Sequence, residues 1–364
     1  MSKVLNWAKN WYARYERPIS SISLVGGFVF DIFTLRRIDA LWDNLWTAGH
    51  LIIVGICIVL VNRYPGNHED AADSGKLHFW LVNILQFFFG GLLSTFLVFY
   101  FRSASLIVAW PFIILLALAF IANESLKRHY ARLWFQIILF YLSLFCFTIY
   151  FVPVILHQIG RTAFVVSGLA SLVLMQLFLM ALQKFGKENI WNSRWIIGSS
   201  IVGIFVLLNV MYFTNIMPPI PLSLKDGGPY YWIGRDASGN YTGAYEDLGW
   251  KKYFSLYDSF HIEANQPVFV YSAVFAPTKV SLTVVHDWQH YDEVSKKWVD
   301  VYKVNLPVVG GREEGFRTYS ILRNTDVGKW RVQVETTSGQ VIGTIRFNVF
   351  RPTGVVNFKT ETKN

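Results

Sequence analysis

The sequence is poor in charge and in cysteine. Of its 364 residues, 16% are charged and 53% are hydrophobic, a balance that excludes a disordered chain and is too apolar for most soluble domains. Its two cysteines, Cys57 and Cys146, both lie inside apolar runs, which excludes a disulfide scaffold and a cysteine-rich zinc site. The apolar content therefore predicts a protein that contacts membrane lipids.

Enzymatic motifs are also missing. The sequence has no GxSxG, HExxH, P-loop or dinucleotide-binding pattern. The triplet His68-Glu69-Asp70 attracts notice, but a solvated turn in a polar loop explains it better. We therefore expect no catalytic residue, no cofactor and no metal site, and the inventory favours a non-enzymatic protein.

Long apolar runs fill the first part of the chain. A membrane-spanning helix needs about 20 mostly apolar residues, and seven segments qualify as candidates. They are residues 18–35, 42–62, 78–101, 104–122, 133–156, 161–182 and 195–214. The first segment is the weakest candidate because it contains Asp31. The sequence thus predicts a helical membrane domain of about seven spans over residues 18–214.

The positive charges orient this domain. Residues 1–219 carry 16 Lys and Arg against 9 Asp and Glu. With seven spans and a cytoplasmic N-terminus, 12 of these cations fall on the cytoplasmic side and 4 on the other, which agrees with the positive-inside rule. Six spans, with the first segment remaining inside, also satisfy the rule. We favour seven, because residues 220–364 lack cysteine and are rich in strand signals, as suits a periplasmic domain of a bacterial inner-membrane protein.

The same cations argue against nucleic-acid binding, because they stand at the ends of apolar runs and form no stripe on a soluble surface. In residues 1–17, apolar side chains recur at helical spacing among four cations. This pattern predicts an amphipathic helix on the cytoplasmic membrane surface. It serves either as an anchor for the first span or as a binding site for a partner.

Residues 215–229 contain four prolines and two glycines and are predicted to be a stiff linker, neither helix nor central strand. Over residues 230–364 the apolar period changes to two, as in 329–336, where Trp330, Val332 and Val334 share one face. Strands are also predicted at residues 267–275, 279–290, 297–305, 315–322 and 340–350. Short strands at such spacing predict an all-β, immunoglobulin-like sandwich with Trp288 and Trp330 inside.

Three motifs in this β region belong together: a His-x-Trp strand, a Gly-Gly turn with a following Gly-aromatic-Arg stretch, and a Gly-x-Trp-Arg-Val strand. They comprise His286, Trp288, Gly310, Gly311, Gly315, Phe316, Arg317, Tyr319, Ser320, Gly328, Trp330, Arg331 and Val332, followed by Gly339 and Gly343. The combination resembles the bacterial family catalogued as domain of unknown function 2914. The membrane part is similar to the uncharacterised multispan region that often precedes this domain. The resemblance implies a protein of the bacterial cell envelope and carries over no activity.

Several residues of the β region are candidates for binding. Arg317 and Tyr319 follow the Gly-Gly turn, and an exposed arginine beside aromatics suits an anionic ligand, although Arg317 also has a possible partner across the sheet in Glu335. Tyr231 and Trp232 lie in the aromatic stretch 229–245, which predicts either a stacking platform or a plain β-hairpin.

His286 is a further binding candidate, with the more common alternative of a core-edge histidine bonded to the backbone. A metal site with His290 is not expected, because four residues along a strand separate the two by about 13 Å. In the membrane part, Asp31 is the ionisable candidate, since such a group within a span is costly unless paired or hydrated. Asn83 and Gln86 would present a polar patch on another span.

Two hypotheses follow. In the first, the membrane part anchors a periplasmic domain that binds a protein partner or an envelope glycan, as in an accessory subunit of a membrane complex. In the second, the chain is a membrane-embedded carrier or lipid-modifying enzyme and the β domain covers its outer mouth. The shortage of charged residues within the spans favours the first.

Overall fold

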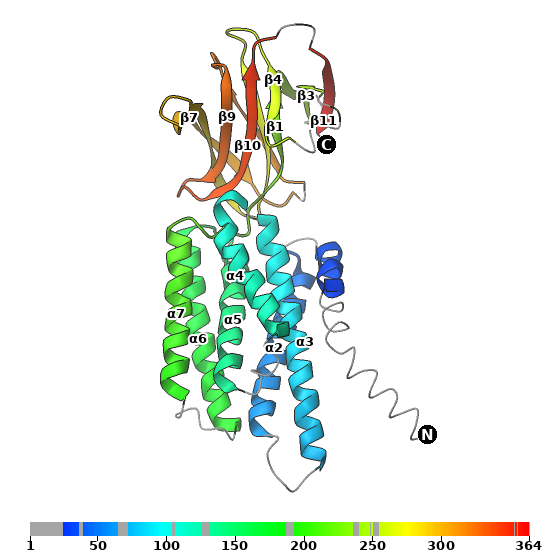
Figure 1. Cartoon of the computed structure of the whole chain (residues 1–364), viewed down its shortest axis with the longest axis vertical. Coiled ribbons are helices and arrows are strands. Elements are labelled where there is room, and N and C mark those ends of the chain that lie inside the picture. Colours follow the sequence, from blue (N-terminus) through cyan, green and yellow to red (C-terminus); the bar gives the residue numbers. More distant parts are fainter. Residues whose placement is uncertain are drawn as a thin grey trace, which may run out of the picture. The chain divides into compact units, whose positions relative to one another are not determined.

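The computed structural model describes residues 25–35, 39–64, 72–103, 106–125, 132–186, 193–235, 240–247, 249, 255–312, 314–352, 354 and 356–363. The chain divides into a helical unit that ends at Thr214 and a unit that contains Asn215–Asn364 (Figure 1). The predicted amphipathic segment 1–17 and the triplet His68-Glu69-Asp70 lie outside the described residues.

Seven helices form in the described part of the chain. They are Val25–Thr34, α2 (Leu41–Arg63), α3 (Ala72–Ser103), α4 (Leu106–Ser125), α5 (Leu133–Leu156), α6 (Arg161–Phe185) and α7 (Arg194–Phe213). Five of them are long and apolar enough to cross a membrane, namely α2, the Trp80–Ser103 part of α3, α5, α6 and α7. The prediction of an apolar helical region followed by a β region is confirmed.

Aromatic and polar contacts join the helices. The ring of Phe145 on α5 stacks on Phe205 of α7 with centroids 5.7 Å apart, and Phe164 of α6 stacks on Tyr212 of α7 at 3.7 Å. Between α2 and α5, Asn62 donates a hydrogen bond to Gln136 at 2.7 Å, and both side chains are buried. Such pairing is required where water is absent, because an unpaired amide in an apolar interior is costly.

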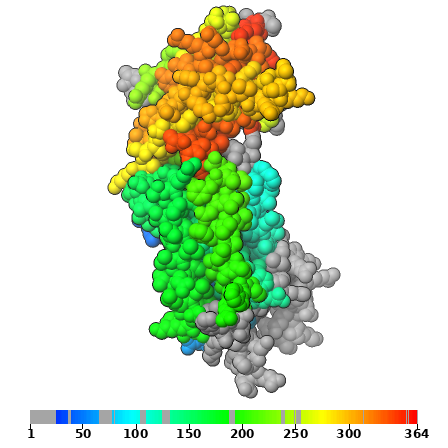
Figure 2. Space-filling model, turned by 90° about the vertical axis from the view of Figure 1, so that its left-hand side faces the viewer, coloured from blue at the N-terminus to red at the C-terminus, as the bar shows by residue number. Residues whose placement is uncertain are grey.

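The second unit consists of eleven described strands in three sheets. They are β1 (Ser223–Tyr230), β2 (Trp232–Arg235), β3 (Tyr241–Glu246), β4 (Asp258–His261), β5 (Val268–Phe275), β6 (Ser281–Asp292), β7 (Lys297–Val309), β8 (Phe316–Leu322), β9 (Gly328–Thr336), β10 (Val341–Phe350) and β11 (Phe358–Lys363). The sheet orders are β1-β5-β8, β4-β10-β9-β6-β7 and β11-β3-β2. Strand β7 is the outermost of the five-stranded sheet and is mostly exposed, on the surface that faces the viewer in Figure 2.

One hydrophobic core is shared by the first two sheets. Val268, Val270 and Val274 of β5 pack in one cluster with Trp288 of β6 and Trp330 of β9. The indoles are 0% and 2% exposed, so the predicted inward orientation of both tryptophans is confirmed. Alternation places every second residue of β6, β9 and β10 in this core, and it leaves the intervening side chains on what we call the outer face of the five-stranded sheet.

The third sheet packs on the other side of β1-β5-β8. Tyr230, Ile233, Tyr271 and Ala273 are buried in a second cluster, to which Tyr319 also contributes. The prediction differs from the structure at the linker, because residues 223–229 form most of β1. Pro229 is tolerated there, since β1 is an edge strand of its sheet.

Two positions of the Gly-Gly turn motif, 310 and 315, require glycine for steric reasons. A Cβ atom on Gly310 would lie 1.9 Å from the carbonyl oxygen of Pro277, and Gly315 has a φ of +90°. The first position therefore has no room for a side chain, and the second has a backbone conformation that other residues rarely adopt.

Candidate functional site

Arg317 and Tyr319 do not lie on an open surface. Both are on β8, on the side covered by the third sheet, and Arg317 is 8% exposed. The ring of Tyr319 lies 6.0 Å from that of Tyr241. Glu335, the alternative partner of Arg317, instead lies 4.0 Å from Lys303 on the five-stranded sheet. The expectation of an exposed arginine is thus wrong, because a further sheet packs over this part of β8.

His286 lies deeper than expected. It is 0% exposed, and its ring nitrogens lie 2.8 Å from the hydroxyl oxygens of Ser272 and Ser320, not beside backbone groups. Burial lowers the pKa of His286 to about 4. A histidine in this position stabilises the core and is inaccessible to a ligand.

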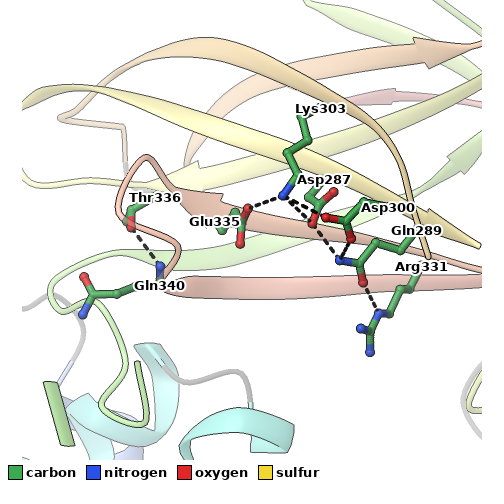
Figure 3. Close-up of polar contacts among 8 residues, drawn as sticks. All are labelled: Asp287, Gln289, Asp300, Lys303, Arg331, Glu335, Thr336 and Gln340. Carbon is green, nitrogen blue, oxygen red and sulfur yellow. Dashed lines mark hydrogen bonds and ion pairs between the residues drawn. The ribbon is translucent and has the colours of Figure 1, made fainter. Parts of the chain in front are cut away.

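The outer face of the five-stranded sheet carries a polar network (Figure 3). We use this name for Asp287 and Gln289 of β6, Asp300 and Lys303 of β7, and Arg331 and Glu335 of β9. The ammonium nitrogen of Lys303 lies 3.2 Å from Asp287, 3.3 Å from Asp300 and 4.0 Å from Glu335. Three carboxylates from three strands thus converge on one lysine.

Burial and charge perturb these groups. Asp287 is 2% exposed, and its buried Oδ1 has no hydrogen-bond partner among the residues that the structure describes. Burial raises the pKa of Glu335, and the negative charge of Asp287 raises it further. Burial lowers the pKa of Lys303, but its bonds to Asp287 and Asp300 outweigh this effect and raise it overall. The network therefore holds more negative charge than its lysine neutralises.

Gln289 connects the carboxylates to Arg331. Its amide nitrogen donates to Asp287 and to Asp300, each at 2.7 Å, and its amide oxygen accepts from Nε of Arg331 at 2.6 Å. The guanidinium carbon of Arg331 lies 4.3 Å from the ring centroid of Trp298, within the range of a cation–π interaction. Gln289 and Trp298 therefore both hold the guanidinium group of Arg331 in place.

A pocket of about 480 Å³ contains one of the predicted residues, Tyr231. We call it the Tyr231 pocket, and its lining consists of Tyr231, His261, Glu263, Gln266, Pro267, Pro352, Gly354, Val356 and Phe358. Phe358 is 57% exposed, and its ring meets that of Tyr231 edge-on with centroids 4.6 Å apart. The lining thus combines an accessible aromatic ring with hydrogen-bonding side chains.

Glu246, which is not a lining residue, contacts two residues that are, Tyr231 and His261. Its carboxylate accepts from the backbone N–H of His261 at 2.9 Å and lies 2.7 Å from Nδ1 of the same residue. The hydroxyl of Tyr231 lies 2.8 Å from Glu246, and burial together with this carboxylate raises the pKa of Tyr231. Because Nδ1 faces Glu246, Nε2 is the ring nitrogen of His261 left to meet a ligand.

Trp232, the other predicted aromatic, is separate from the pocket. It is 52% exposed and lies over Gly234, where a Cβ atom would be 2.4 Å from the indole. Strands β2 and β3 pair antiparallel, as the hairpin alternative predicts. The structure therefore does not bring the five predicted binding residues into one site.

In the helical unit, Asp31 accepts a hydrogen bond from the hydroxyl of Ser94 on α3. Of the predicted polar pair Asn83 and Gln86, the amide nitrogen of Gln86 donates to the backbone carbonyl of Asn123 on α4 at 3.3 Å. Sequence analysis missed His50 of α2, which lies close enough to Asp31 to interact with it electrostatically. His50 is a second ionisable residue within an apolar run, and this feature of the sequence could have identified it as a candidate.

Metal binding has no support in the part of the chain that the structure describes, where no group of three or more His, Cys, Asp or Glu is placed to hold an ion. This finding applies to the three carboxylates around Lys303 as well.

Comparison with known proteins identifies the class of the β region. Residues 281–349 match the family described as protein of unknown function (DUF2914), so the resemblance seen in the motifs is confirmed. The C-terminal part of the chain contains this domain, and an N-terminal region precedes it.

No curated protein matches the chain. Among solved structures, the chain aligns with Pseudomonas fluorescens alkylpurine DNA glycosylase AlkC bound to DNA containing an abasic site analog. The identity is 9%, the alignment covers 85% of this chain and 99% of that one, and the TM-score is 0.23. A score this low carries no argument about fold or activity.

Proposed function

We propose that the chain is an inner-membrane protein of bacteria with seven spans, which holds an immunoglobulin-like sandwich in the periplasm, and that this domain binds an envelope glycan. The observation that carries the proposal is the Tyr231 pocket. Sugars are bound where an aromatic ring meets their C–H face and nearby polar groups bond their hydroxyls. Phe358 supplies the ring, and His261, Glu263 and Gln266 supply the polar groups.

The test uses the full chain in detergent and soluble oligosaccharides released from bacterial cell wall, with affinity measured by calorimetry. Phe358→Ala and His261→Ala should each weaken binding by about tenfold, since each removes one aromatic or hydrogen-bonding contact. Tyr302→Ala is the matched control, because Tyr302 is an aromatic residue on β7 that is 47% exposed and lies outside the pocket. Absence of saccharide binding, or an equal loss in the control, would refute glycan recognition.

The alternative function, a membrane-embedded carrier or lipid-modifying enzyme, is favoured by a different observation. Asp31 and Ser94 bond to each other between two helices, and His50 interacts electrostatically with Asp31. A carboxylate, an imidazole and a hydroxyl are groups that can take part in proton transfer. Substitution of Asp31 in the full chain distinguishes the two functions, because it should abolish proton transfer and leave glycan binding intact.

A further inference from the structure

Arg331 of β9 and Arg346 of β10 are direct cross-strand partners on the outer face of the five-stranded sheet. Side chains paired in this way have Cβ atoms about 5 Å apart, and like charges in such pairs repel. Both residues are partly buried, which strengthens the repulsion because less water screens it. A negative group bound to both guanidinium groups would relieve it.

The carboxylates of the polar network do not fill this role. Asp287, Asp300 and Glu335 all lie within 4.0 Å of Lys303. Among the residues that the structure describes, no ion pair joins Arg331 or Arg346 to a carboxylate. The contact that reaches Arg331 from this side comes through the neutral amide of Gln289.

Arg331 is held ready for a ligand. Its Nε atom donates to Gln289 at 2.6 Å, and its guanidinium carbon lies 4.3 Å from the ring centroid of Trp298. These two contacts leave the terminal nitrogens of the guanidinium, which form the donor pair that matches two oxygens of a carboxylate or phosphate. A side chain fixed in this way loses little freedom when it binds.

The electrostatic surroundings of Arg331 also favour the binding of a negative group. Burial lowers the pKa of Arg331 and the charge of Arg346 lowers it further, and the opposing charges of Asp287 and Asp300 do not cancel this effect. Tyr257 also lies close enough to Arg331 to interact with it electrostatically.

We propose that Arg331 and Arg346 form a binding site for an oxyanion, the phosphate or carboxylate group of a ligand. Arg331 acts as the pre-oriented fork, and Arg346 supplies the second charge. The site is separate from the Tyr231 pocket, because Arg346 is four residues from Phe350, the partner of His261 on β10, or about 13 Å along the strand. It can therefore exist whether or not the domain binds a glycan.

The experiment titrates the full chain in detergent with three probes at constant ionic strength, with chloride as the reference anion. Inorganic phosphate and acetate distinguish the two oxyanions, and glycerol 1-phosphate distinguishes a lipid-type phosphate ester from free phosphate. Arg331→Gln and Arg346→Gln should each weaken binding of the preferred probe by at least about tenfold, because each removes a charge-assisted contact. Lys329→Gln is the matched control, since Lys329 is a cation on the same face of β9 that is paired with Glu293 at 3.9 Å.

Folding is monitored separately through the melting temperature without added oxyanion. Arg346→Gln should leave it unchanged or raise it, because the substitution removes a repulsion. The proposal is overturned if neither phosphate nor acetate binds more tightly than chloride. It is also overturned if Lys329→Gln loses as much affinity as the two arginine variants, which would mean that any surface cation has the same effect.

Discussion

Nδ1 of His286 lies 2.8 Å from the hydroxyl oxygen of Ser320, inside the core shared by two sheets. The same hydroxyl accepts a hydrogen bond from the indole of Trp288 at 2.9 Å. On the other side of the ring, Nε2 lies 2.8 Å from the hydroxyl of Ser272, which is 3.0 Å from that of Thr318. The neutral imidazole is thus satisfied at both nitrogens without any acidic group, and nothing in this chain of hydroxyls compensates a positive charge.

Acid should destabilise the β domain through His286. Its pKa is about 4 in the folded chain and ordinarily 6.5, so between these values the unfolded chain binds more protons. The contribution is complete above pH 6.5 and is lost as the pH falls toward 4, and it amounts to roughly 3 kcal/mol. Denaturant unfolding at pH 7 and pH 4.5 measures it. His286→Gln should flatten this part of the profile, and an unchanged wild-type stability at pH 4.5 would contradict the assignment.

Residues 215–364 should fold when excised, because they contain every buried residue of the core shared by the first two sheets. We expect a β-type circular dichroism spectrum and a cooperative melt. In this segment Trp330→Ala should cost about 3–5 kcal/mol, as a large deletion in a packed core. Trp232→Ala is the control, because that indole is 52% exposed and its removal should cost far less. A gradual melt would show that the fold depends on the helical unit.

Asp31→Asn should be close to silent in the cell if function resides in the β domain. The amide oxygen of asparagine can still accept the hydrogen bond from Ser94, so the helices should remain joined. Asp31→Leu removes the acceptor and should lower the amount of folded protein in the membrane. If Asp31→Asn abolishes the phenotype while deletion of residues 220–364 is tolerated, the carrier or enzyme function replaces glycan binding.

Alkaline phosphatase fused after Asn364 should be active if the proposal of seven spans and a cytoplasmic N-terminus is right, because this topology would place the C-terminus in the periplasm. A fluorescent protein that matures only in the cytoplasm should be dark at the same position. The reverse pair of results would indicate six spans and a cytoplasmic β domain.

The long strands could be predicted because their apolar residues alternate. Strands β5, β8 and β10 fall within predicted segments, whereas β6, β7 and β9 overlap predicted segments and extend beyond them, to Asp292, to Val309 and back to Gly328. Both core tryptophans point inward as expected. Strands β4 and β11 were missed, since Asp258–His261 has four residues and Phe358–Lys363 has one apolar residue. Neither is long enough or apolar enough to produce a period.

The sites were harder to predict than the strands. The alternation of side chains along a strand predicts which residues share a face with Arg317, but it does not predict that a third sheet covers that face. The contact between Arg331 and Trp298 depends on how three strands align, and the pocket joins Tyr231 to Phe358, which is distant in sequence. Register and sheet packing are long-range properties that a local pattern does not contain.

Strand β7 has 13 residues and, among the strands that the structure describes, a hydrogen-bonded neighbour on one side only. A free edge of this length is a template on which another chain can add a strand. Lys297, Lys303 and Pro307 lie on it, and the pairing register shifts between Trp288 and Gln289 opposite Val301. Edge lysines, a proline and a bulge all oppose strand addition. Copies of this domain at high local concentration should therefore not pair edge to edge through β7.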